Sequence, residues 1–256
     1  MVREVNLTRR SALFAVVGGL ACSEQRLERR HIVVYSEPGR FGGWPANHGI
    51  WSWGNEILVG FSAAYFKRMP PDRHQYDSAK PEEPRLARST DGGETWTIEA
   101  PRSLLPPEQG GKDTAPLREP MNFHAPGFAM TLRFTDVDVG PSRLWFTYDK
   151  GKTWRGPHEF PMFGRLGIAA RTDYIIGGER EALAFVTAAK ENGQEGRPLC
   201  VRTTDGGLTW SIRGWIGEEP EGFSIMPSSV QLKDGRILTA VRVKRDRTTD
   251  WLELYE

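Results

Sequence analysis

Short runs of alternating apolar and polar residues recur along the chain, and turns rich in glycine, asparagine and aspartate separate them. Alternation with a period of two predicts β-strands with one buried face. The runs that predict strands are 32–35, 48–53, 56–62, 85–88, 128–132, 143–146, 182–187, 199–202, 229–232, 237–242 and 251–256. The 28 glycines, 18 prolines and 9 tryptophans fit many turns with aromatic packing between them. The pattern therefore predicts an all-β fold.

One eight-residue pattern, Ser/Thr-x-Asp-x-Gly-x-Thr-Trp, occurs three times at nearly even spacing. The copies occupy residues 89–96, 147–154 and 203–210, so that successive aspartates are 58 and 56 residues apart. A period of this length predicts a structural repeat, in which each copy belongs to one sheet that is buried only between its neighbours.

Each copy predicts a hairpin turn with a structural role and no part in catalysis. In the first copy, Asp91 can accept hydrogen bonds from backbone N–H groups of its own turn. Gly93 supplies a positive-φ position, and Trp96 covers the turn with an apolar ring. The equivalent residues are Asp149, Gly151 and Trp154 in the second copy and Asp205, Gly207 and Trp210 in the third.

These three copies resemble the Asp-boxes, or BNR repeats, of the sialidase-like β-propellers. The resemblance covers about residues 31–256 and implies a six-bladed propeller of four-stranded antiparallel blades. About three and a half blades are present, because the chain ends where a fourth box is due. We therefore expect residues 24–256 to form a partial propeller and the chain to be the N-terminal fragment of a longer protein.

Residues 1–23 have the layout of an export signal. Arg9 and Arg10 precede an apolar run at 12–21, as in a twin-arginine leader, and Cys22 follows it as in a lipoprotein cleavage site. We expect a periplasmic or extracellular protein, with membrane anchoring through a lipidated Cys22 as an open possibility. The alternative is that this segment is an amphipathic first helix of a cytoplasmic protein.

Charge and motif content argue against several classes of partner. The formal net charge of +1 offers no electrostatic footprint for nucleic acid. The five histidines lack the spacing of metal ligands, and no phosphate-binding loop or dinucleotide fingerprint occurs. We expect no metal and no cofactor.

The resemblance also directs the choice of site residues, because in the family the boxes lie on the face opposite the active site. Exo-sialidases of the family place an acid/base Asp in the loop before the first box, where Asp77 fits best and Asp72 second. They hold the carboxylate of sialic acid with three arginines, since a guanidinium matches a carboxylate with two parallel hydrogen bonds. The second of these arginines matches Arg242, at the end of the stretch 234–242.

Other family positions are matched poorly. The first arginine has no counterpart, since residues 45–48 stand there and His48 alone among them can carry positive charge. Asn47, His124 and Arg68, at strand entries and in a loop, complete the candidate substrate-binding residues. Each candidate has a structural alternative: Arg242 or Asp77 as a solvated surface charge, and His48 or His124 as a hydrogen-bonded structural histidine.

The function that this resemblance implies is that of an exported exo-glycosidase, which hydrolyses terminal sugars such as sialic acid from glycans or glycoconjugates. The missing first arginine, and a missing glutamate just before Val230, leave an alternative open. That alternative is a propeller without catalysis, or with another specificity, that binds carbohydrate or protein on the same face.

Overall fold

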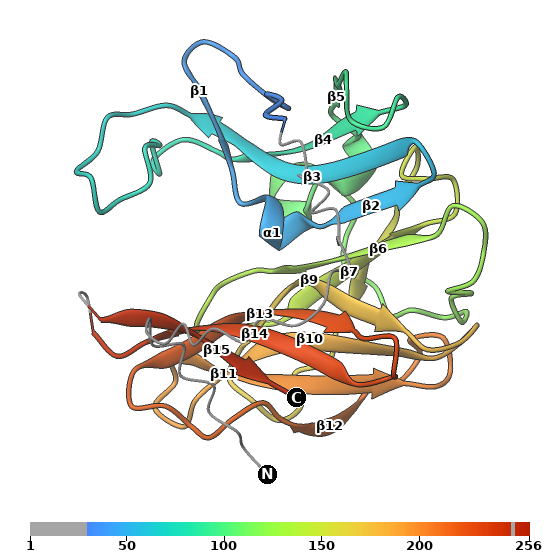
Figure 1. The fold of residues 1–256 in the computed structure, drawn as a ribbon, viewed down its shortest axis with the longest axis vertical. Coiled ribbons are helices and arrows are strands. Elements are labelled where there is room, and N and C mark those ends of the chain that lie inside the picture. The colour runs from blue at the N-terminus through green and yellow to red at the C-terminus, as the bar shows by residue number, and fades with distance from the viewer. Residues whose placement is uncertain (1–29, 247–248) are drawn as a thin grey trace, which may run out of the picture. The chain divides into compact units, whose positions relative to one another are not determined.

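The computed structural model describes residues 30–246 and 249–256. The expected export signal, with Cys22, lies outside the described residues. Residues Val33–Glu256 form one compact unit, in which the strands build four antiparallel sheets stacked face to face in chain order (Figure 1). The all-β expectation is confirmed.

The first sheet has an interrupted inner strand. β1 (Arg40–Gly43) pairs with one end of β3 (Glu56–Tyr65) and β2 (Ile50–Trp53) with the other, and the single turn α1 (Pro45–His48) lies between them. The strand expected at 48–53 therefore begins two residues later. Gly60 allows the insertion, because a Cβ there would lie 2.7 Å from the Cβ of His48. The sheet is completed by β4 (Glu83–Ser89) and β5 (Thr97–Glu99).

The other sheets follow the same order of antiparallel neighbours. Two 3-10 turns, η1 (Arg102–Leu104) and η2 (Pro107–Gln109), lead to the second sheet, which contains β6 (Ala129–Phe134), β7 (Ser142–Thr147) and β8 (Arg155–Glu159). The third sheet contains β9 (Ile168–Ile176), β10 (Ala182–Ala189), β11 (Glu195–Thr203) and β12 (Ser211–Trp215), and the fourth β13 (Phe223–Gln231), β14 (Ile237–Lys244) and β15 (Asp250–Tyr255). The expected four strands per repeat are present in the third sheet. They are also present in the first sheet if β1 and β2 are counted as one interrupted strand.

The prediction of a strand at 32–35 is wrong. The segment is irregular, and it packs Val34 and Tyr35 against the first sheet, with the rings of Tyr35 and Phe61 4.8 Å apart. The apolar residues of this segment pack against the first sheet, but among the described residues the segment forms no backbone pairing with a neighbouring strand.

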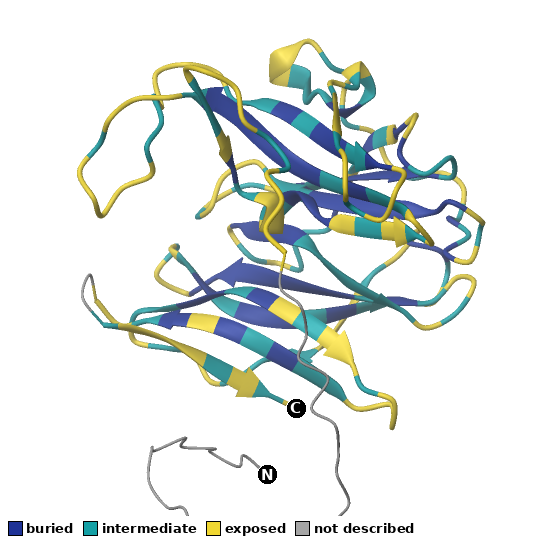
Figure 2. Ribbon diagram, turned by 45° about the horizontal axis from the view of Figure 1, so that its top comes forward, coloured by how far each residue is buried: buried dark blue, intermediate teal, exposed yellow. Residues whose placement is uncertain are grey.

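The core consists of layers between successive sheets. Leu58 and Leu86 of the first sheet meet Trp145 and Trp154 of the second, and a larger cluster joins the second sheet to the third. Figure 2 shows the buried strands of these inner layers and the alternating exposed positions of the fourth sheet. None of the helices in the described part of the chain combines the length and apolarity that a membrane crossing needs.

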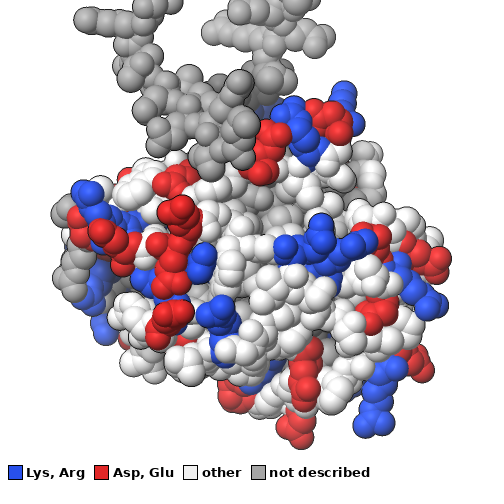
Figure 3. Space-filling model, turned by 90° about the horizontal axis from the view of Figure 1, so that it is seen from below, with Lys and Arg blue, Asp and Glu red and all other residues white. Residues whose placement is uncertain are grey.

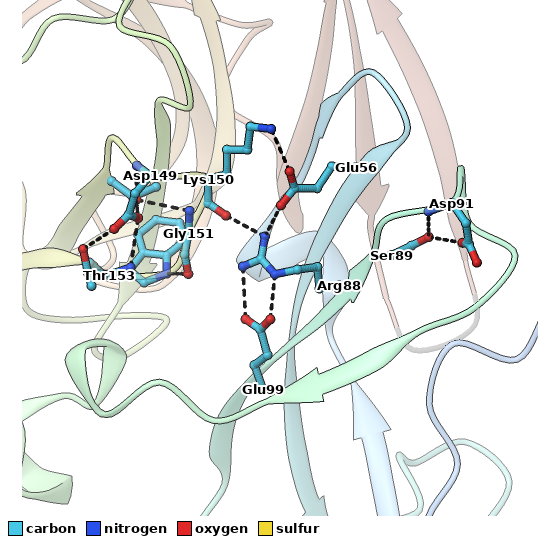
Figure 4. Close-up of polar contacts among 11 residues, drawn as sticks. Glu56, Arg88, Ser89, Asp91, Glu99, Asp149, Lys150, Gly151 and Thr153 are labelled. Atoms are coloured by element: carbon cyan, nitrogen blue, oxygen red, sulfur yellow. Dashed lines mark hydrogen bonds and ion pairs between the residues drawn. The ribbon is translucent and has the colours of Figure 1, made fainter.

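The three turns at 89–96, 147–154 and 203–210, called the repeat turns, share one geometry. In the second, Asp149 accepts hydrogen bonds from the Thr153 amide at 2.9 Å and from the hydroxyls of Thr147 and Thr153, both at 2.6 Å. The Trp154 indole donates to the Gly151 carbonyl (Figure 4). Asp91 and Asp205 accept the equivalent bonds in their turns. These aspartates are fully used in holding their turns.

An ion-pair cluster joins the first sheet to the second repeat turn. Arg88 donates to Glu99 at 2.6 Å, to Glu56 at 2.8 Å and to the Lys150 carbonyl at 2.8 Å, while Lys150 Nζ lies 2.7 Å from Glu56 (Figure 4). Lys150 has φ 59°, at a position where the other two turns have glycine. The repeat-turn edge of these sheets is thus closed by matched charges.

Candidate functional site

Cavities lie between the sheets, and one of them, called the side cavity, is lined by the first and second sheets and by the turns that join them. Its volume is about 390 Å³. Ser62 and Pro84 line it from the ends of β3 and β4 farthest from the first repeat turn, and Phe134 from the end of β6 farthest from the second. The side cavity therefore lies at the edge opposite the repeat turns. The other lining residues are Trp44, Asn47, His48, His74, Tyr76, Glu82, Leu104, Pro106, Glu108, Gln109, Arg133, Arg143 and Trp145.

His48 is a buried, uncharged histidine in the wall of the side cavity. Its Nε2 lies 3.0 Å from the Ser62 hydroxyl. Burial lowers the pKa of His48 well below its usual value, and the positive charge of Arg133 lowers it further. The ring thus stays neutral at physiological pH, and its Nδ1 has no hydrogen-bond partner among the described residues.

Arg133 is a partly buried cation without a carboxylate partner in the described part of the chain. It donates through Nε to the Thr131 hydroxyl at 3.4 Å, and its guanidinium lies 5.6 Å from the centre of the Trp145 ring. Burial lowers the pKa of Arg133 to about 9, which leaves the group charged at neutral pH. A buried charge of this kind is costly unless an anion accompanies it.

Unpartnered polar atoms concentrate at the side cavity. Among the described residues, Asn47 Oδ1, His48 Nδ1, Arg133 Nη2 and Trp145 Nε1 are all buried without a hydrogen-bond partner. Each such group costs about 1–3 kcal/mol if it stays unsatisfied. Donors and acceptors gathered around one cavity are suited to a ligand with several hydroxyl groups and a negative charge.

The side cavity holds two glutamates with opposite pKa shifts. Burial raises the pKa of Glu82, and a hydrogen bond from Ser62 offsets this only in part. Burial also acts on Glu108, but the hydrogen bonds from Arg143, at 2.9 and 3.0 Å, lower the pKa of that carboxyl overall. Glu82 therefore keeps its proton to a higher pH than Glu108 does.

Aromatic rings form one wall of the side cavity. The Trp44 ring lies 4.9 Å from the Tyr76 ring, 5.5 Å from His74 and 5.3 Å from Phe41. Trp44 has φ 55°, which is strained for a bulky residue and costs about 1–3 kcal/mol. Such strain clusters at ligand sites, and aromatic walls with few polar groups are typical of pockets for small molecules.

The second cavity, called the central cavity, has a volume of about 590 Å³ and is lined by the first, third and fourth sheets. Its one carboxyl group is Asp173, which accepts hydrogen bonds from the Ser229 amide at 3.2 Å and hydroxyl at 2.9 Å. Burial raises the pKa of Asp173 to about 7. A single carboxyl that already holds two sheets together offers less chemistry than the side cavity.

The expected acid/base residues lie in the loop at 66–82, near the side cavity but not in its wall. Asp77 Oδ1 lies 3.3 Å from Lys67 Nζ and accepts a hydrogen bond from the Ala79 amide. Asp72 and Arg68 are exposed on the same loop. Of the expected substrate-binding residues, Asn47 and His48 line the side cavity.

Two expected site residues lie elsewhere. His124 precedes β6, which begins opposite Thr147 at the start of the second repeat turn, so His124 lies at the repeat-turn edge. The sequence contains the signal for this placement: two apolar runs, 128–132 and 143–146, stand between His124 and the second repeat turn, so the first of them begins at the edge where that turn lies. Arg242, on β14, is exposed and lies 3.4 Å from Asp250. Neither residue lines the side cavity or the central cavity.

Glu82 and Arg133 were not expected from the sequence. Glu82 stands in the charged run 80–85 and Arg133 in an ordinary strand, so nothing in the local pattern separates them from surface charges. Among the described residues, no group of three or more His, Cys, Asp or Glu is placed to hold a metal ion. Figure 3 shows acidic and basic side chains interspersed on the face that it draws.

Comparisons with known proteins show a distant similarity. No protein-family model matches the chain. A xyloglucanase from Paenibacillus sp. is 28% identical over 162 residues, which cover 54% of this chain and 14% of the relative.

Among solved structures, a protein of unknown function from Dyadobacter fermentans overlaps 82% of this chain and 64% of its own, with a TM-score of 0.59 and 17% identity. Trypanosoma rangeli sialidase overlaps 82% of this chain and 36% of its own, with a TM-score of 0.48 and 14% identity. The chain thus spans less than two thirds of these proteins, and the Dyadobacter structure shares its fold.

Proposed function

We propose that this chain belongs to a carbohydrate-active β-propeller and that its side cavity hydrolyses a terminal glycosidic bond. The observation that carries the proposal is Glu82, a carboxyl with a raised pKa in a cavity with aromatic walls and unpartnered polar atoms. The three repeat turns, which resemble Asp-boxes, and the similarity to a xyloglucanase support it.

Glu82 takes the role of general acid in this proposal, and Glu108 that of the ionised partner. Glycoside hydrolysis by paired carboxyls needs one group that protonates the leaving oxygen and one that stays charged. Environments that push two pKa values apart assign these roles. Burial raises the pKa of Glu82, and the hydrogen bonds from Arg143 lower the pKa of Glu108.

Arg133 favours a sugar that carries a carboxylate, such as sialic acid or a uronic acid. Its buried charge lacks a carboxylate partner in the described part of the chain, and a guanidinium binds a carboxylate through two parallel bonds. In this proposal Arg133, and not Arg242, binds the carboxylate of the sugar. Export, with lipid attachment at Cys22, belongs to the same proposal and rests on residues 1–23.

The test compares Glu82→Gln with Asp77→Asn and Asp72→Asn on chromogenic sialosides, glucuronides and neutral glycosides. Removing a general acid should lower kcat by about 100-fold or more, whereas the two loop variants should stay within about threefold of the native rate. Loss of turnover in Asp77→Asn, with Glu82→Gln still active, would restore Asp77 as the acid and contradict this assignment.

A second candidate is a propeller that binds glycans without cleaving them. The exposed position of Glu108 and its two hydrogen bonds to Arg143 favour it, because a carboxylate held in an ion pair is a weaker base. Saturable binding of an acidic sugar, with no turnover of any glycoside by the native chain, would decide for this candidate.

A further inference from the structure

Two arginines lie directly opposite each other in the wall of the side cavity. Arg133 on β6 is the register partner of Arg143 on β7, and both line the cavity. Residues paired in this way point to the same face of the sheet, with Cβ atoms about 4.5–5.5 Å apart, and like charges in this position destabilise the sheet. Among the described residues, a carboxylate contacts Arg143 but none contacts Arg133. The two arginines therefore favour a further negative charge between them.

The ion pair between Arg143 and Glu108 uses one nitrogen of the guanidinium. Nη1 donates to both carboxyl oxygens, at 3.0 and 2.9 Å, whereas Nε and Nη2 donate to no residue that the structure describes. The strong form of such a pair has two nitrogens that donate in parallel to the two oxygens. The Glu108 side chain is also 58% exposed, and ion pairs in contact with water contribute little. Glu108 is therefore a weakly held counter-ion.

The turn that carries Glu108 is anchored independently of Arg143. The side-chain amide of Gln109 donates to the backbone carbonyl of Glu82 at 2.8 Å. The Gly110 and Gly111 amides donate to carbonyls of the same turn, each at 3.0 Å. The Glu108 side chain can therefore leave Arg143 while η2 keeps its shape. The released carboxylate stays on a turn that is bonded to the segment of Glu82.

We propose that Glu108 is a resident counter-ion, which the acidic group of the ligand displaces from Arg143, so that Arg133 and Arg143 bind that group together and Glu108 is released. The use of the released carboxylate rests on the proposed function, because there the acidic group of the substrate frees the ionised partner that hydrolysis needs. The exchange itself is a binding event and does not depend on hydrolysis.

Calorimetric titration of the 256-residue protein with methyl glucuronide and with N-acetylneuraminic acid tests the exchange. Glu108→Gln should bind the acidic sugar about two- to fivefold more tightly than the native protein, because the ligand no longer competes with a resident carboxylate. Glu219→Gln is the matched control, since it removes an equal charge from an ion pair with Arg197 outside the cavity wall. Its affinity should stay within about 1.5-fold of the native value. Affinity that is unchanged or lower in Glu108→Gln, or no binding of either acid, would overturn the proposal.

A second substitution tests whether Arg143 itself contacts the ligand. The double variant Arg143→Met/Glu108→Gln should bind the acidic sugar about tenfold more weakly than Glu108→Gln, because one charge-assisted contact is lost. Arg143→Lys in the same background keeps the charge but not the fork of nitrogens, and its affinity should lie between these two. Equal affinity of the double variant and Glu108→Gln would show that Arg143 does not bind the ligand, and would refute the exchange.

Turnover separates the exchange from the proposed function. If the protein is a hydrolase, Glu108→Gln should lower kcat for an acidic glycoside by about 100-fold or more, while KM falls because binding tightens. Native protein that shows the expected changes in affinity but cleaves no glycoside would refute the hydrolase and leave the exchange in place. Native turnover, with an acidic-sugar affinity that Glu108→Gln does not raise, would refute the exchange and leave the hydrolase.

Discussion

Arg88 and Arg133 are both partly buried arginines of the first two sheets, but their surroundings differ. At the repeat-turn edge, Arg88 donates to Glu56, Glu99 and a backbone carbonyl. At the cavity edge, Arg133 has one long hydrogen bond and an unpartnered Nη2. A fold can hold a buried charge cheaply when it supplies the counter-charges. The unmatched arginine is therefore the place where we propose that a ligand completes the site.

Removing Arg88 should have the largest effect on stability. Arg88→Met leaves Glu56 and Glu99 without their main cationic partner, and breaking such a cluster should lower the free energy of unfolding by about 3 kcal/mol. Urea unfolding followed by tryptophan fluorescence measures the change. The exposed Arg102→Met is the control and should stay within about 0.5 kcal/mol of the native protein. If Arg88→Met and Arg102→Met were equally stable, Arg88 would contribute no more than an exposed arginine, and the contrast between Arg88 and Arg133 would fail.

Asp173 should make stability depend on pH. Its pKa is about 7 in the folded chain and near 3.8 when unfolded, so the folded state binds more protons between these values. Stability is then greatest below about pH 4, falls by about 4 kcal/mol as pH rises to 7, and is level above that. Asp173→Asn should flatten this profile. A profile that rises between pH 4 and 7, or a fall that is equally steep in Asp173→Asn, would assign the titration to other groups.

Arg133→Met should change stability less than Arg88→Met. No carboxylate in the described residues loses a partner, and an apolar side chain of similar size removes the cost of burying a charge. The free energy of unfolding should stay within about 1 kcal/mol of the native value, or rise. A loss of 3 kcal/mol would mean that Arg133 has a structural partner, and that the cavity edge is no different from the repeat-turn edge.

Lys150→Gly should have the smallest effect, because two contributions oppose each other. Glycine relieves the positive φ of 59° by about 1 kcal/mol, while the bond from Lys150 Nζ to Glu56 is worth a similar amount or less. The Arg88 bond to the backbone carbonyl of residue 150 remains. The midpoint of thermal unfolding should shift by no more than a few degrees. A larger drop would mean that the ion pair between Lys150 and Glu56 stabilises the fold by more than the strain at Lys150 costs.

The repeat turns could be predicted from the sequence because their contacts are local. Asp149 bonds residues two before and four after it, and any chain with that spacing can form the turn. The side cavity could be predicted only in part. Asn47 and His48 were predicted from their place at the entry to the first inner strand, but Glu82 and Arg133 are brought together by the packing of two sheets, which no local pattern encodes.

His124 shows how the order of strands limits such predictions. Its place beside an apolar run suggested an inner strand, yet that run pairs directly with the strand that carries the second repeat turn. The number of strands between a residue and the next turn decides the edge on which it lies. That count, and not the residue type, separates His124 from His48.

The most direct test is a calorimetric titration of the 256-residue protein with sugars matched in all but charge. The probes are methyl glucuronide against methyl glucoside, together with N-acetylneuraminic acid. The account predicts that the native protein binds an acidic sugar in preference to the neutral one, and that Arg133→Met weakens this binding by about 100-fold, the value of a bidentate charge-assisted contact. Equal binding of acidic and neutral sugars, no binding of either acid, or acidic-sugar affinity unchanged in Arg133→Met, would contradict it.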